Sequence, residues 1–126
     1  NLWYLGEDTT AFEYDDAGHV IASSRTGSWE AGRNGARAGL AMLPHPAVGL
    51  SYQQEFAAGV AEDRARVDKV GEVATIGLGT FSGCIVIRES TPLTPGDIER
   101  KTYCPNVGLV SVDLKGGGAE AIDLGL

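Results

Sequence analysis

The sequence predicts a mostly β domain in which short antiparallel strands follow one another as a meander. Segments rich in β-branched and aromatic residues recur at intervals of about ten residues, a spacing typical of all-β folds. Glycine is frequent, with 18 residues in a chain of 126, and its positions between these segments mark turns and strand ends. We therefore expect a single β domain over residues 1–126, built as a curled sheet, a half-barrel or a barrel.

The most clearly predicted element is a β-hairpin whose arms end in the only two cysteines, Cys84 and Cys104. The segment 92–96, PLTPG, supplies the proline and glycine of a turn. Folding the arms about Thr94 places the cysteines opposite each other, where directly paired residues have Cβ atoms about 4.5–5.5 Å apart. A disulfide needs about 3.5–4.5 Å. We therefore predict a disulfide at a close, non-hydrogen-bonded pair, with two buried free thiols as the alternative.

The same hairpin register has an electrostatic defect. It sets Arg88 against Arg100 on the two arms. It also sets Glu89 against Glu99, and like charges directly opposite each other destabilise a sheet. A slip of one residue would pair Arg88 with Glu99 but would separate the cysteines. A β-bulge would reconcile the two requirements.

The other strands are expected on both sides of this hairpin, with turns at 15–18, at Gly71-Glu72 and at 115–118. The segment 60–70 is compatible with a helix or a strand, and we predict a strand because its neighbours are strand-like. The predicted strands are 2–5, 11–14, 19–23, 27–30, 40–43, 49–56, 60–70, 73–78, 107–114 and 119–124.

Charge and composition exclude several classes of partner and place the protein in a compartment. The formal net charge of −7 argues against nucleic acid, which requires a basic surface, and against anionic membranes. No segment approaches the roughly 18 apolar residues of a membrane-spanning helix. The predicted disulfide indicates an extracellular or cell-envelope location. Because the chain starts at Asn1 without an apolar leader, we expect a removed signal segment or a longer parent chain.

Two carboxylates are candidates for catalysis. Glu30 follows Trp29, and Glu55 follows an amide-rich strand end, so either side chain can lie inside a cavity. Paired carboxylates perform general acid/base chemistry when an apolar pocket raises the pKa of one of them. We therefore name Glu30 and Glu55 as candidate catalytic residues of a hydrolase or isomerase. The sequence carries no metal-ligand spacing and no nucleotide-binding glycine motif, so we predict no metal and no cofactor.

Four aromatic residues are candidates for ligand binding. Trp3 and Tyr4 lie in the first predicted strand, Trp29 in a short strand, and Tyr52 in the strand 49–56. A sheet can hold an apolar ligand on such an aromatic face. The alternative is that these rings fill the core between the sheet and its cover.

Six short segments carry a resemblance that covers nearly the whole chain. In order, they are WYLGEDT, GSWEAG, YQQE, AED, TPLTPG and VGLV. In this pattern the chain resembles a group of secreted or lipoprotein-like bacterial proteins of unassigned function. The resemblance implies an extracellular or envelope location and assigns no catalytic residue. Members of the group carry further strands before WYLGEDT, which implies that these 126 residues are the C-terminal part of a larger β fold.

Three classes of function follow, in order of preference. The first is a secreted, non-catalytic β domain that binds a small apolar ligand or a protein partner. The second is an extracellular structural subunit that forms a homo-oligomer, or receives a complementing chain, through an open strand edge at residues 2–6. The third is the carboxylate-based hydrolase or isomerase.

Overall fold

The computed structural model describes residues 1–115 and 118–121, in which all regular secondary structure is β-strand and all strand pairs are antiparallel. The predicted fold class is therefore confirmed. Among these residues, no helix is long and apolar enough to cross a membrane. The strands are β1 (Leu2–Tyr4), β2 (Gly6–Glu7), β3 (Ala11–Tyr14), β4 (Val20–Ser24), β5 (Trp29–Glu30), β6 (Gly39–Met42), β7 (Ser51–Gln53), β8 (Arg64–Ile76), β9 (Gly79–Ser90), β10 (Ile98–Cys104), β11 (Gly108–Leu114) and β12 (Gly118–Ala121).

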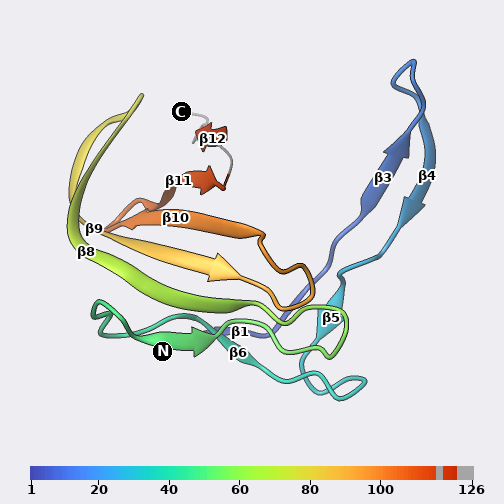
Figure 1. Ribbon diagram of the computed structural model, residues 1–126, viewed down its shortest axis with the longest axis horizontal. Helices are drawn as coiled ribbons and strands as arrows, with labels where there is room; N and C mark the ends of the chain where they lie inside the picture. Colours follow the sequence, from blue (N-terminus) through green and yellow to red (C-terminus); the bar gives the residue numbers. More distant parts are fainter. Residues whose placement is uncertain (116–117, 122–126) are drawn as a thin grey trace.

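The main sheet is a six-stranded meander. Its strand order is β12-β11-β10-β9-β8-β7, so each strand pairs with its neighbours in the sequence. Figure 1 shows this sheet curling, with the long strands β8 and β9 bending together. Because β7 and β12 are its two edges, the sheet is open, and the curled sheet is the predicted form that the structure adopts. The end of the predicted strand 119–124, from residue 122, lies outside the described residues.

The hairpin formed by β8 and β9 corrects one predicted turn. Strand β8 continues through residues 71–72, and the chain reverses at 77–78 instead, where Ile76 pairs with Gly79. The register between β8 and β9 shifts between Val67 and Ala74. Gly71 has a φ of 71°, which glycine adopts at little cost. The glycine that suggested a turn therefore lets the strand bulge and bend without reversing.

The predicted strand 49–56 extends too far at both ends, and the predicted strand 60–70 begins too early. Strand β7 ends at Gln53 and β8 begins at Arg64, and the chain turns between them, closed by an isolated bridge between Ala57 and Ala61. The amide groups of residues 54 and 55 both donate to the carbonyl oxygen of Asp63, at 2.9 and 3.2 Å. Two donors on one acceptor interrupt the regular ladder, and this ends the strands.

The register predicted for the cysteine hairpin is confirmed. Strands β9 and β10 pair symmetrically about Thr94, without a slip or a bulge. Cys84 and Cys104 form a disulfide with their Cα atoms 4.2 Å apart. The arginines and glutamates of the hairpin do lie opposite their own kind.

The like-charge pairs are offset by charges from neighbouring positions. Asp68 on β8 lies 3.2 Å from Nε of Arg100 and 3.9 Å from Nε of Arg88. On the other face of the hairpin, the Nζ of Lys101 pairs with both Glu89 and Glu99. Each pair of like charges therefore contacts one side chain of opposite charge. This contact offsets the repulsion, so the hairpin keeps its symmetric register.

The N-terminal residues form three two-stranded pairs: β1 with β6, β2 with β5, and β3 with β4. Figure 1 shows β1, β5 and β6 beside the main sheet, while the β3–β4 hairpin projects away from it. All residues of β3 and β4 are exposed. Strand β1 pairs with β6 through Trp3 opposite Leu40 and Tyr4 opposite Gly39. One edge of β1 is thus occupied, and the predicted assembly through residues 2–6 would have to use the other edge.

The core is divided into three small clusters. One surrounds Trp29 in the N-terminal part, one lies under the centre of the main sheet, and one surrounds the disulfide. Their buried members are, respectively, Trp29, Ala36, Ala57 and Ala61; Ala65, Val67 and Ile87; and Cys84, Cys104 and Val110. Because no single core dominates, the space between the first two clusters remains open to polar groups.

Candidate functional site

Trp29 lines one cavity and donates a hydrogen bond to a residue of a second cavity. Strand β5 carries this residue and pairs with β2, with Glu7 opposite Trp29. The indole is 7% exposed, and its ring packs edge-on against Tyr4, with centroids 5.6 Å apart and an interplanar angle of 72°. Trp29 lines the larger cavity, and its Nε1 donates to Glu55, which lines the smaller one.

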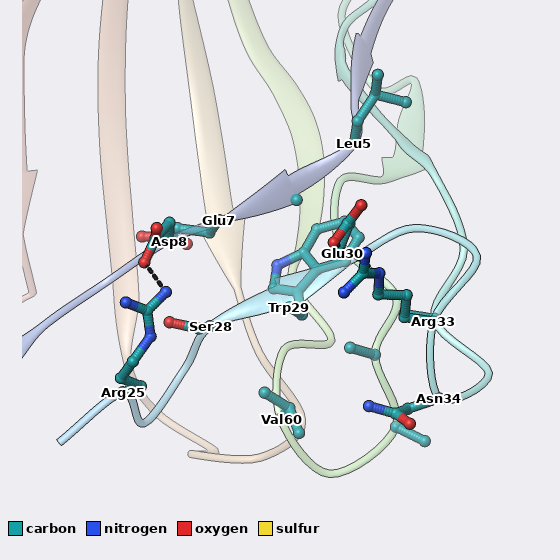
Figure 2. A pocket seen from close by; sticks show the side chains of 14 residues that line it. Leu5, Glu7, Asp8, Arg25, Ser28, Trp29, Glu30, Arg33, Asn34 and Val60 are labelled. Carbon is teal, nitrogen blue, oxygen red and sulfur yellow. Dashed lines mark hydrogen bonds and ion pairs between the residues drawn. The ribbon is translucent and has the colours of Figure 1, made fainter.

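The larger cavity has a volume of about 640 Å³ and an apolar floor beneath a charged rim. Trp29, Ala36 and Ala57 form the buried floor. Figure 2 shows the indole between an ion pair of Arg25 with Asp8 on one side and the side chains of Glu30 and Arg33 on the other. The other residues that line it are Leu5, Gly6, Glu7, Ser28, Asn34, Ala58 and Val60.

The smaller cavity, of about 350 Å³, is lined mainly by polar residues. Four separate parts of the chain converge on it: β1 and β2, β6, the segment 54–63 before β8, and the facing strands β9 and β10. The shared hydrogen bonds to the carbonyl oxygen of Asp63 hold the backbone of 54–55 beside that residue. The lining residues are Tyr4, Glu7, Ala41, Gln54, Glu55, Asp63, Glu89, Lys101 and Tyr103.

Glu89 and Lys101 form a compensated pair in the wall of the smaller cavity. Glu89 is 7% exposed, and its carboxylate accepts hydrogen bonds from Lys101 Nζ and, at 3.0 Å, from Gln54 Nε2. Burial opposes the charge on Lys101, but the hydrogen bond and the charge of Glu89 outweigh it, so the pKa of Lys101 is raised. The ammonium group of Lys101 is therefore anchored against Glu89.

Glu55 lies in the same cavity without such compensation. It is 8% exposed, and Trp29 Nε1 donates to its Oε1 over a long 3.4 Å. Burial is the largest cause that raises the pKa of Glu55 to about 6, and the charges of Asp63 and Glu7 add to it against opposing hydrogen bonds from Tyr4 and Trp29. The pKa of Asp63 is also raised, again mainly by burial.

Replacing Glu55 with glutamine is expected to stabilise the protein near neutral pH by about 1–2 kcal/mol. In the folded state the pKa is raised from 4.5 to about 6, so the folded protein holds a proton that the unfolded chain releases. The contribution of Glu55 is therefore fully present below pH 4.5 and is lost as the pH rises through about 6. Glutamine removes this loss while keeping an acceptor for Trp29.

Urea unfolding at several pH values checks this expectation. The difference between Glu55→Gln and the parent protein should grow from acid to neutral pH. Glu62→Gln, which changes a nearby carboxylate outside both cavities, should show no such growth. A Glu55→Gln protein that is less stable than the parent at neutral pH would contradict the uncompensated burial of this carboxylate.

The predicted site residues lie in different surroundings. Glu30 lines the larger cavity but is largely exposed and paired with Arg33, whereas Glu55 lines the smaller one, so these two carboxylates do not face one common substrate site. Trp3 is 57% exposed. Tyr52 packs against the cluster under the main sheet, and its buried hydroxyl has no hydrogen-bond partner among the described residues. Tyr4 and Trp29 are the two predicted aromatic residues that line cavities.

The sequence reasoning missed Asp63, Glu89 and Lys101 as members of a site. The sequence could have indicated that Glu89 and Lys101 are neighbours, because the register about Thr94 places both on one face of the hairpin. Asp63 lies just before β8, and no local pattern connects it to that face. Only the packing of the segment 54–63 against the hairpin brings it there.

Within residues 1–115 and 118–121, no three His, Cys, Asp or Glu side chains are grouped so that they could hold a metal ion. The arrangement thus offers a larger cavity with an apolar floor and a charged rim, and a smaller acidic cavity, with Glu7 in the lining of both. Among protein-family models, curated proteins and solved structures, none matches this chain.

Proposed function

We propose that this protein is a secreted, non-catalytic binding domain that holds a small ligand with an apolar body against Trp29 in the larger cavity. The observation that carries the proposal is the buried indole at the floor of a cavity of about 640 Å³. Ligand sites typically have volumes of about 300–1,000 Å³ and mostly apolar linings with a few polar groups.

The lining favours an apolar ligand that carries a small uncharged polar group, because both of its arginines are already paired with carboxylates. Trp29, Ala57 and Val60 offer apolar contact, and the small side chains on the floor leave room for a ring or a short chain. Arg25 and Arg33 stand at the rim, each next to a carboxylate. A ligand group that hydrogen-bonds to a guanidinium would therefore orient the ligand without being buried.

The Cys84–Cys104 disulfide supports the proposed location. Disulfides persist in oxidising compartments and are rare in the reducing cytosol. This bond, together with the resemblance to secreted bacterial proteins, favours an extracellular or envelope protein.

N-Phenyl-1-naphthylamine, an uncharged aromatic probe with one polar N–H group, tests the site. The chain has two tryptophans, so Trp3→Phe at the exposed position leaves Trp29 as the single emitter. We expect saturable probe binding with energy transfer from Trp29. Val60→Asp should weaken this binding by about tenfold or more, because it places a charge against the apolar body of the probe.

Val48→Asp is the matched control, since Val48 and Val60 both lie in turns and are 62% and 47% exposed. Val48 lies outside the cavity, and its replacement should leave probe binding unchanged. Equal affinities of the two variants for the probe, or no saturable binding to the parent protein, would refute the proposal.

A further inference from the structure

We infer that the smaller cavity is a second binding site, which recognises the primary ammonium group of a small amine. Its lining includes four carboxylates, which belong to Glu7, Glu55, Asp63 and Glu89, and one ammonium group, which belongs to Lys101. The lysine is already engaged by Glu89 and Glu99. The cavity therefore has a deficit of positive charge that the described residues do not supply.

Glu55 is the carboxylate that most clearly lacks a cationic partner. Its side chain is more than nine-tenths buried and lines the cavity, yet among the described residues no cationic side chain lies within ion-pair distance of it. It accepts a hydrogen bond of 3.4 Å from Trp29 Nε1 and one from Tyr4, and both donors are neutral. Buried charges in proteins are normally paired, so a carboxylate in this position is suited to a cation that arrives from outside.

Aromatic rings complete the surroundings expected for an ammonium group. Tyr4 and Tyr103 both line the cavity, and tyrosine rings attract cations through their faces. An organic ammonium group with a short apolar chain gains from both the carboxylates and the rings. A bare metal ion would gain little, because the described acidic residues are not grouped as metal ligands.

A neighbouring hollow favours a diamine over a simple amine. This hollow, of about 180 Å³, shares Asp63, Glu89 and Lys101 with the smaller cavity and adds Asp97 and Glu99. Carboxylates therefore line both the smaller cavity and this neighbouring hollow. A linear molecule with an ammonium group at each end could place one near Glu55 and the other near Asp97.

Isothermal titration calorimetry with putrescine tests the inference, with butanediol as the uncharged molecule of the same length. We expect saturable binding of putrescine and none of butanediol. Glu55→Gln should weaken putrescine binding by about tenfold or more, since it removes a charged hydrogen-bond acceptor. Glu62→Gln, outside the cavity, should bind like the parent protein.

A short acetylated peptide with a single lysine distinguishes the possible sources of the ammonium group. Tighter binding of putrescine than of the peptide identifies free amines as the ligand class. Tighter binding of the peptide would overturn the assignment to a small amine and point to a lysine side chain. Binding of putrescine that is absent, or equal in Glu55→Gln and the parent, would overturn the site itself. Since the two cavities are tested by different probes and variants, either proposal can fail alone.

Discussion

Replacing Cys84 and Cys104 together with alanine is expected to lower the free energy of unfolding by about 3 kcal/mol, because the loop between them no longer restricts the unfolded chain. The two cysteines are 20 residues apart in the sequence. Both sulfur atoms also lie in the core, where Cys84 is 0% and Cys104 is 4% exposed and both pack with Val110. The lost packing adds to the loss of the loop constraint.

Urea unfolding of the double variant measures the effect, and the parent protein under reducing conditions is its control. Reduction opens the same loop without removing the sulfur atoms, so the reduced parent should lie between the oxidised parent and the variant in stability. A variant as stable as the oxidised parent would show that the loop constraint and the buried sulfur atoms contribute little.

Replacing Gly39 with alanine is expected to cost about 3 kcal/mol of stability, at the upper end of the range for overpacking. A Cβ atom at this position would stand 1.9 Å from the carbonyl oxygen of Gln54 and 2.4 Å from its carbonyl carbon. These are backbone atoms of a segment tied to Asp63. The overlap therefore cannot be relieved by turning a side chain, and β6 must move away from the segment that carries Glu55.

Unfolding in urea again gives the magnitude, and Gly77→Ala provides the control. Gly77 lies in the turn between β8 and β9, with no heavy atom near the position of an added Cβ. Its replacement should change stability little. If Gly39→Ala were as stable as Gly77→Ala, the close approach of β6 to residue 54 would be wrong, and so would the backbone position that we assign to Glu55.

The cysteine hairpin is the element that the sequence predicts most completely. Its turn residues, its alternation and its register about Thr94 all come from residues close together in the chain, and the structure confirms them. The like-charge pairs looked like an argument against this register. Lys101 of the hairpin itself compensates the glutamates, but the compensation of the arginines by Asp68 depends on which strand lies next to β9, and the hairpin sequence contains no information about that.

The long strand β8 and the segment before it show where local reasoning fails. Gly71 was interpreted as a turn, but a glycine with positive φ serves a bulge as well as a reversal. Whether the chain reverses there depends on the pairing of β8 with β9 over its full length. The same limitation applies to residues 54–63, where two amides share one carbonyl oxygen, so β7 ends earlier and β8 begins later than predicted.

Only part of the candidate site could be predicted from the sequence. Trp29 and Tyr4 could be named as aromatic residues on short strands, and Glu55 as a carboxylate beside a strand end. Sequence reasoning could not assign these residues to different cavities. That assignment depends on the side of the indole from which each neighbour approaches.

The sequence by itself determined the β class, the meander order of the main sheet, the hairpin register and the disulfide, because strand alternation and turn chemistry act between residues that are near in the chain; the pairing of β1 with β6 and of β2 with β5 did not follow from it. Only the tertiary structure decided which carboxylates share a cavity and which of them lack a counter-charge. Charge compensation and burial act through space, between segments such as 54–63 and β10 that the chain connects by a long path.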